Sequence, residues 1–249
     1  MAAPVNLEKG TANNNVMSQG TEPSSILADE KGGPTLGRTL TTDTQPAFPV
    51  YHRRFANPSP LGLYSFASTT LMLSLINVGA RGLTVPNAVV GMAFGYGGLC
   101  QLLAGMWEFA SGNTFGATAF TSYGGFWFSY AIISTPAFGI GSAYTGEAAS
   151  QLPIAIGIFL EMWFIVTVLI FFATFRSSIA LSFLFFTLAF AFLLLGISNL
   201  LAEPACQTAG GAFGIVAALT AYYAGSAGLY SPDTSYFILP VGELPKLKD

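Results

Sequence analysis

Apolar residues dominate the chain from residue 60 to residue 230 and occur there in six long runs. The runs cover residues 60–79, 86–108, 113–135, 153–175, 178–200 and 210–230. Each is about 20 residues long, the length that an α-helix needs to cross the ~30 Å hydrocarbon core of a bilayer. Lipid offers backbone groups no partners, and the runs lack the alternation of a membrane β-barrel. The pattern therefore predicts an all-α, polytopic membrane protein with six transmembrane helices.

The segments on either side of these runs have a different composition. Residues 1–56 are rich in Asn, Ser, Thr, Gly and Pro and lack apolar periodicity, which is typical of a disordered tail. Residues 240–249 follow the last run and contain two lysines. We therefore expect a disordered N-terminal tail, a six-helix transmembrane domain over residues 57–239 and a short C-terminal tail.

Basic residues next to the runs predict the orientation in the membrane, because Lys and Arg gather in cytoplasmic loops. In a six-helix arrangement, Arg81 falls on one side, and the other side carries Arg53, Arg54, Arg176, Lys246 and Lys248. Both termini are therefore expected in the cytoplasm.

Composition supports a membrane protein and excludes several other classes. Hydrophobic residues make up 52% of the chain and charged residues only 8%, about a third of the share in soluble domains. A net charge of −3 without a basic cluster gives no sign of a nucleic-acid partner. Cys100 and Cys206 provide neither a disulfide framework nor metal-ligand spacing, so no metal or cofactor is expected.

Hydroxyl and amide side chains interrupt the apolar runs. They cluster in the first and third runs or lie near the ends of runs: Ser65, Ser68, Thr69, Thr70, Asn77, Gln101, Asn113, Thr114, Thr118, Thr121, Ser122 and Asn199. A single Ser or Thr in a membrane helix often bonds its own backbone carbonyls. Clusters instead favour a polar seam through the bundle, suited to a small polar solute.

The side chains missing from the runs narrow the chemistry of that solute. No Lys, Arg or His lies deep in a run, so a carboxylate would cross among neutral donors or as the protonated acid. Carboxyl groups have pKa values of about 4, so mild external acidity supplies a neutral fraction. His52 lies in the tail and no base–nucleophile pair is recognisable, so we do not expect an enzyme.

Glu161 is the exception among the residues deep in a run. It follows Pro153 by eight residues, which places it ~12 Å into the membrane by helical rise. An ionisable residue at that depth is a candidate proton carrier. A protonated or hydrogen-bonded Glu at a contact between helices or subunits explains it equally well.

Several motifs along the chain occur in the order known from one family. They are "NPSPLGLYSFASTT" (57–70), "NVG" (77–79), "YGGLCQLLAGMWEFASGNTFGATAFTSYGGFW" (96–127), "FF" before Thr187-Leu188, and "GISN" (196–199). With them the chain resembles the acetate uptake transporter family, which includes bacterial succinate–acetate permeases and fungal acetate transporters. The resemblance covers about residues 55–240, and Ser59 departs from the Ala that this family usually has there.

The resemblance implies a six-helix protomer that assembles as a homo-hexamer, with a pore through each protomer. It also implies a narrow apolar constriction formed by Phe66, Tyr123 and Leu188. Helical rise places these residues ~9–15 Å from the cytoplasmic ends of their runs, as a gate in mid-membrane requires. Glu161 has no counterpart in the family pattern, which weakens its assignment as a proton carrier.

The opening turn, residues 57–60, is expected to start the first helix and cap its free amides. This leaves a positive helix end where an anion arrives. Together with the polar seam, it gives a candidate substrate pathway: Asn57, Pro58, Thr69, Asn77, Gln101, Thr118, Ser122 and Asn199.

The sequence therefore predicts a plasma-membrane transporter or channel for acetate and similar short monocarboxylates, moved with a proton. Two alternatives stay open. An ammonium or ammonia exporter would suit the same hydroxyl-lined pore, and some fungal relatives carry that label. A membrane sensor of acetate that signals through its tail is the alternative without transport.

Overall fold

The computed structural model describes residues 55–245. Residues 1–54 of the predicted N-terminal tail, which include Arg53 and Arg54, and both C-terminal lysines lie outside this range. Helices account for most of the described chain: α1 (Ser59–Asn77), α2 (Asn87–Phe94), α3 (Gln101–Ser111), α4 (Thr114–Ser134), α5 (Gln151–Ala173), α6 (Ile179–Leu201) and α7 (Pro204–Leu229). A π-helical segment, Gly95–Cys100, joins α2 to α3 without a break. Between residues 55 and 245 there is no strand, so the predicted all-α class is confirmed.

Five helical units are long and apolar enough to cross a membrane: Ser59–Asn77, Asn87–Ser111, Gly146–Ala173, Ile179–Leu201 and Pro204–Leu229. The last of them begins six residues before the predicted run, because Pro204 fits the first turn of a helix and Gln207 and Thr208 do not interrupt it. The 21-residue α4 is not among the five, and its sequence is rich in Thr, Ser, Tyr and Gly.

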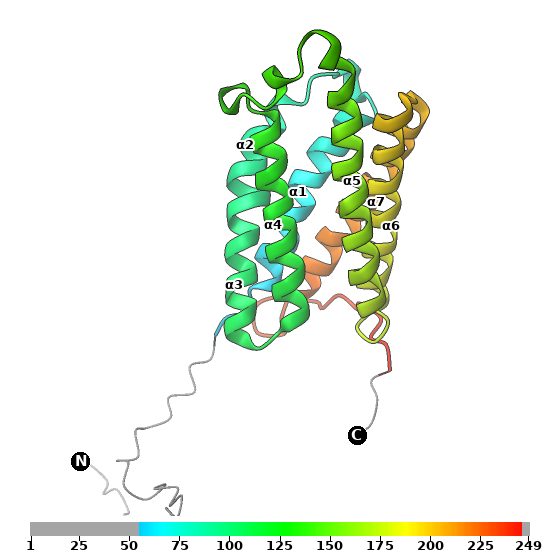
Figure 1. Cartoon of the computed structure of the whole chain (residues 1–249). Coiled ribbons are helices and arrows are strands. Elements are labelled where there is room, and N and C mark those ends of the chain that lie inside the picture. The colour runs from blue at the N-terminus through cyan, green and yellow to red at the C-terminus, as the bar shows by residue number, and fades with distance from the viewer. Residues whose placement is uncertain (1–54, 246–249) are drawn as a thin grey trace, which may run out of the picture. The chain divides into compact units, whose positions relative to one another are not determined.

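The helices run alternately up and down the bundle (Figure 1). We call the end where α1 begins the proximal end, and it also holds the α3–α4 and α5–α6 turns. The opposite, distal end holds the long connection between α4 and α5. Accordingly α1, α4 and α6 all run from proximal to distal. Around the bundle, α5 packs on α6, α6 on α7, α7 on α1, and α1 on α3, which in turn packs on α4. The backbones of α4 and α5 come close at only a few points.

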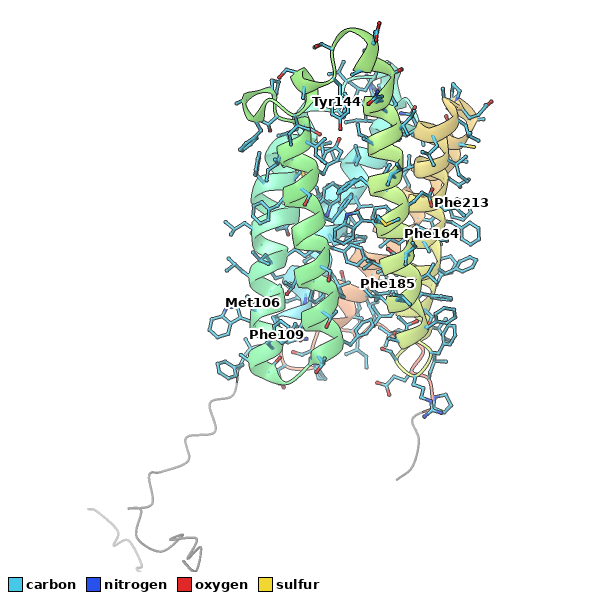
Figure 2. All side chains as sticks on the ribbon, viewed as in Figure 1. Met106, Phe109, Tyr144, Phe164, Phe185 and Phe213 are labelled. Carbon is cyan, nitrogen blue, oxygen red and sulfur yellow. The ribbon has the colours of Figure 1, made fainter. Side chains whose placement is uncertain are left out.

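The outer surface of the bundle is apolar. Met106 and Phe109 of α3 project away from the other helices (Figure 2) and are about half exposed. One face of α5 exposes large side chains at helical spacing: Ile154, Ile158, Met162, Ile165, Leu169 and Phe172. Such a surface suits lipid or neighbouring subunits rather than water, as expected for a multi-pass membrane protein.

The C-terminal segment docks on the proximal end. The amides of Ile179 and Ala180, at the start of α6, donate to the carbonyls of Gly242 (2.8 Å) and Val241 (3.1 Å). The hydroxyl of Ser178 accepts the next amide, from Leu181, at 3.2 Å. First-turn amides have no partners within their own helix, so this segment and Ser178 together cap α6, the helix that carries Leu188.

Candidate functional site

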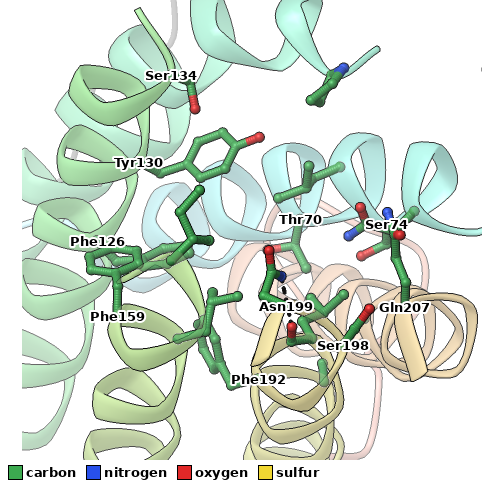
Figure 3. Close-up of a pocket in the computed structure, with 18 of the residues that line it drawn as sticks. Thr70, Ser74, Phe126, Tyr130, Ser134, Phe159, Phe192, Ser198, Asn199 and Gln207 are labelled. Carbon is green, nitrogen blue, oxygen red and sulfur yellow. Dashed lines mark hydrogen bonds between the residues drawn. The ribbon is translucent and has the colours of Figure 1, made fainter. Parts of the chain in front are cut away.

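A cavity of about 500 Å³ lies in the distal half of the bundle, between α1, α4, α5, α6 and α7 (Figure 3). Its wall mixes polar side chains (Thr70, Ser74, Asn77, Trp127, Tyr130, Ser134, Ser198, Asn199 and Gln207) with apolar ones (Phe126, Ile133, Phe159, Leu160, Leu188, Phe192 and Leu195). None of the lining residues within the described range is charged. The cavity wall is therefore uncharged, but it carries polar groups that can form hydrogen bonds.

The predicted constriction residues meet at the proximal floor of this cavity. Phe66, Tyr123 and Leu188 belong to one core cluster and are each no more than 4% exposed. The rings of Phe66 and Tyr123 lie 5.7 Å apart between centroids. Leu188 lines the cavity, whereas Phe66 and Tyr123 lie just beneath it.

α1 and α4 run in the same direction, which explains why the cavity ends at the same height on both helices. One helical turn distal to Phe66 and Tyr123 come Thr70 and Trp127, and both of these line the cavity. The cavity thus begins one turn beyond the packed Phe66–Tyr123 pair. Below that turn the helices close on one another.

Tyr123 is the centre of the closed region. Its hydroxyl donates to Thr167 Oγ1 at 2.9 Å. Its ring packs beside Trp163, Phe185 and Phe192, at centroid distances of 6.1, 6.1 and 6.4 Å. These four partners were not predicted from the sequence. A signal was present, because Phe185, Leu188 and Phe192 have the spacing of one helical face.

Two buried donors on the cavity wall have no hydrogen-bond partner in the described chain. They are the hydroxyl of Thr70 and the indole N–H of Trp127, on side chains that are 7% and 1% exposed. Buried polar groups in proteins are nearly always paired, so an unpaired one points to a partner from outside the chain. A small solute with acceptor oxygens would satisfy both donors.

The predicted pathway residues divide between the cavity and other places. Asn77 and Asn199 line it, and the Asn199 amide donates to Leu195 O at 2.9 Å. Thr69 faces away, because it donates to Ser65 O at 2.9 Å and packs against Gly97. Successive helical residues point about 100° apart, which separates Thr69 from Thr70.

Three other predicted positions also lie outside the cavity wall. Thr118 is exposed on the outer side of α4, and Ser122 is half-buried on the same helix. Gln101 is 1% exposed at the start of α3, and its side-chain oxygen has no partner among the described residues. None of these three side chains lines the cavity described above.

Asn57 and Pro58 lie at the proximal end, where the opening turn was expected to cap α1. The side-chain oxygen of Asn57 accepts the Ser59 amide at 3.1 Å, and its side-chain nitrogen donates to Gly228 O at 3.3 Å. Asn57 therefore caps the start of α1 and ties it to the end of α7.

Glu161 packs at the α5–α6 contact and does not line the cavity. A Cβ atom at Gly196 of α6 would lie 2.1 Å from Glu161 Oε1, so a side chain at this position would displace the carboxyl group from its present place. That oxygen is buried and has no hydrogen-bond partner in residues 55–245. The position agrees with a packing role and leaves proton transfer without a visible route to the cavity.

Comparison with known proteins gives consistent matches across the described range. The GPR1/FUN34/yaaH family matches residues 38–246. Acetate permease A of Emericella nidulans is 51% identical over 205 residues, which cover 79% of this chain and 69% of that protein. Ammonia transport outward protein 2 of Saccharomyces cerevisiae is 46% identical over 210 residues, 84% of this chain and 73% of that protein.

The bacterial protein SatP matches both in sequence and in structure. Succinate-acetate/proton symporter SatP of Escherichia coli is 36% identical over 191 residues, 76% of this chain and 97% of that protein. The solved structure of the bacterial acetate channel SatP superposes with a TM-score of 0.67 at 35% identity, covering 76% of this chain and all of that one. The chain belongs to the GPR1/FUN34/yaaH family.

Proposed function

We propose that this chain transports acetate and other short monocarboxylates across a membrane, as the protonated acid or together with a proton. The observation that carries the proposal is the neutral cavity with unpaired donors at Thr70 and Trp127. These donors can bind carboxyl oxygens, but the cavity wall offers no positive charge to a carboxylate. Transferring an unpaired anion from water is costly, so passage with a proton is favoured.

The constriction of Phe66, Tyr123 and Leu188 is proposed as the gate. Apolar constrictions control both wetting and the size of the solute that passes. Support comes from their burial at the cavity floor and from the 5.7 Å spacing of the two rings. The names of two similar proteins, acetate permease A and the acetate channel SatP, agree with this class of solute.

Export of ammonia is the second candidate, because one yeast relative is named for it. Ammonia is small and neutral, and hydroxyl groups would bind it as well. An acetate sensor would need no flux at all. An enzyme is not part of the proposal, since the relatives described above are named as a permease, a transport protein, a symporter and a channel.

We propose six membrane spans, with α4 as the sixth. Its 21 residues suffice to cross the hydrocarbon core, and its Thr, Ser, Tyr and Gly residues account for its lower hydropathy. An even number of spans agrees with both ends of the described chain lying at the proximal end (Figure 1). We propose that this end is cytoplasmic, that the membrane is the plasma membrane and that protomers assemble as hexamers.

The domain boundaries are proposed as residues 1–56 for the tail, 57–239 for the transport domain and 240–249 for the C-terminal tail. Deleting residues 1–50 should leave transport in liposomes near the wild-type rate, because the opening turn and the whole cavity are retained. A truncated protein that reaches liposomes but transports nothing would contradict these boundaries.

One liposome experiment separates the candidate functions by the direction in which the luminal pH changes. Purified protein is reconstituted with a pH dye inside, and sodium acetate or ammonium chloride is added outside at equal pH. Entry of acetic acid acidifies the lumen, whereas entry of ammonia makes it alkaline. The proposal predicts protein-dependent acidification by acetate. Faster alkalinisation by ammonium alone would favour the export of ammonia, and no effect in either case would favour a sensor.

A further inference from the structure

A buried carboxyl group lies at the proximal end, away from the cavity. Glu108, in the last turn of α3, is 2% exposed. Its Oε1 accepts a hydrogen bond from the Ser59 hydroxyl at the start of α1. Its Oε2 accepts from the Asn113 amide at 2.8 Å and, at the longer distance of 3.5 Å, from the Ser111 hydroxyl. We call Ser59, Glu108 and Asn113 the proximal clasp.

The clasp joins the starts of two helices. Ser59 is the first residue of α1, and Asn113 is the N-cap of α4, where its side-chain oxygen accepts the Gly116 amide at 3.0 Å. A Cβ atom at Gly116 would lie 2.9 Å from the carboxyl carbon of Glu108. The backbone of α4 is therefore built close against this carboxyl group.

The same two helices carry two of the proposed gate residues. Phe66 lies two turns after Ser59, and Tyr123 lies nearly three turns after Asn113. Direct contacts between α1 and α4 are few, and both helices pack instead on α3. α1 also packs extensively on α7, and α3 is the helix that links its start to the start of α4. The height of Phe66 relative to Tyr123 thus depends in part on how α3 holds the two helix starts.

We propose that Glu108 is a positioning residue that fixes the register of α1 against α4 and thereby the size limit of the gate. This inference rests on the proposed transport function. The side chain touches no solute. It acts through the Phe66–Tyr123 spacing, because a carboxylate that accepts three donors holds both helix starts in one arrangement.

The test measures uptake of labelled lactate relative to labelled acetate, in liposomes with matched amounts of monodisperse protein. Glu108→Leu removes all the acceptors at similar volume and should raise the lactate-to-acetate ratio at least threefold. Asn113→Asp keeps the cap on Gly116 but turns a carboxylate toward Glu108, and should also raise the ratio. The double variant Glu108→Gln with Asn113→Asp restores one amide–carboxylate bond with its polarity reversed and should return the ratio to the wild-type value.

Tyr64→Phe is the matched control. It removes a hydrogen bond of 2.8 Å between α1 and Ser226 of α7, and leaves the clasp intact. We expect its ratio to stay within twofold of wild type. Generic loosening of α1 would instead raise the ratio in this control as much as in the clasp variants, and would overturn the proposal.

The outcomes distinguish a failure of the proposed transport function from a failure of the positioning role of Glu108. Wild-type protein that carries no acetate contradicts the proposed function. Wild-type protein that carries acetate, with an unchanged ratio in Glu108→Leu or Asn113→Asp, contradicts the positioning role alone. If Glu108→Leu does not fold, the test uses Asn113→Asp and the double variant Glu108→Gln with Asn113→Asp. The positioning role is contradicted if Asn113→Asp does not raise the ratio, or if the double variant does not return it to the wild-type value.

Discussion

Two donors on the wall of the distal cavity differ from the polar groups that join helices in the proximal half. In the distal half, Thr70 and Trp127 present unpaired donors to a cavity of about 500 Å³. In the proximal half, the hydroxyl of Tyr123 is bonded to Thr167, and Glu108 accepts hydrogen bonds from two helix starts. The paired groups hold helices together, whereas the two unpaired donors on the cavity wall are free to bind a solute. Among the described residues, three further unpaired atoms, on Gln101, Thr121 and Glu161, lie away from this cavity. The distal cavity thus offers hydrogen-bond donors to a solute, and the proximal bonds hold helices together.

Closing the distal half should have the largest effect. Asn77 lines the cavity near the distal end of α1 and is half-buried, so Asn77→Trp adds bulk to the cavity far from the closed core. We expect acetate uptake into liposomes to fall at least tenfold. Trp in place of Thr118, which is exposed on the outside of α4, should leave uptake nearly normal. Equal losses at both positions would show that the cavity is not on the route.

Widening the boundary between the halves should change selectivity. Leu188→Ala removes three heavy atoms from the cavity floor, and we expect lactate and succinate to compete several-fold better against labelled acetate. Leu194 on the same helix does not line the cavity and serves as the matched control for Ala. If Ala at Phe66, Tyr123 and Leu188 each left the competition order unchanged, the gate assignment would be wrong.

Weakening the proximal half should cost stability more than transport. Thr167→Val leaves the buried Tyr123 hydroxyl without its acceptor, at a cost of about 1–3 kcal/mol. We expect a lower melting temperature in detergent and a change in acetate uptake of no more than about twofold. Adding Tyr123→Phe to this variant should recover most of the lost stability. A double variant less stable than either single variant would contradict the bond's assigned role.

Glu161 belongs to neither half's proposed function, so its neutral replacement should have the smallest effect. Glu161→Gln keeps the shape that packs against Gly196 and removes the titratable group. We expect unchanged proton flux during acetate uptake, followed with an internal pH dye. Loss of that flux, with assembly intact, would make Glu161 the proton carrier.

The hydrophobic runs located the helices well, because a lipid bilayer requires spanning helices of similar length and apolar composition. The predicted third run, residues 113–135, corresponds to α4, Thr114–Ser134, within one residue at each end. The first turn of α7 was missed, since polar residues after Pro204 look like a loop to a hydropathy pattern. The family resemblance named Phe66 and Tyr123, and the structure brings their rings together.

Side-chain direction was the part that the sequence could not supply. Thr69 and Thr70 are equivalent in a hydropathy pattern, yet only Thr70 faces the cavity, because helix rotation follows from packing against several neighbours at once. In the sequence, Glu108 is a single charged residue at the end of an apolar run. Its role at three helix termini depends on residues that lie 49 and five positions away in the sequence.

Labelled acetate uptake by the reconstituted wild-type protein tests the account in a single measurement. Liposomes with a neutral lumen are placed in labelled acetate at pH 5 or at pH 7, with protein-free liposomes subtracted. We predict protein-dependent uptake that is several-fold faster at pH 5, because the neutral acid and the proton gradient both favour entry there. Uptake no faster than in protein-free liposomes at either pH would contradict a transport pathway through this cavity and gate.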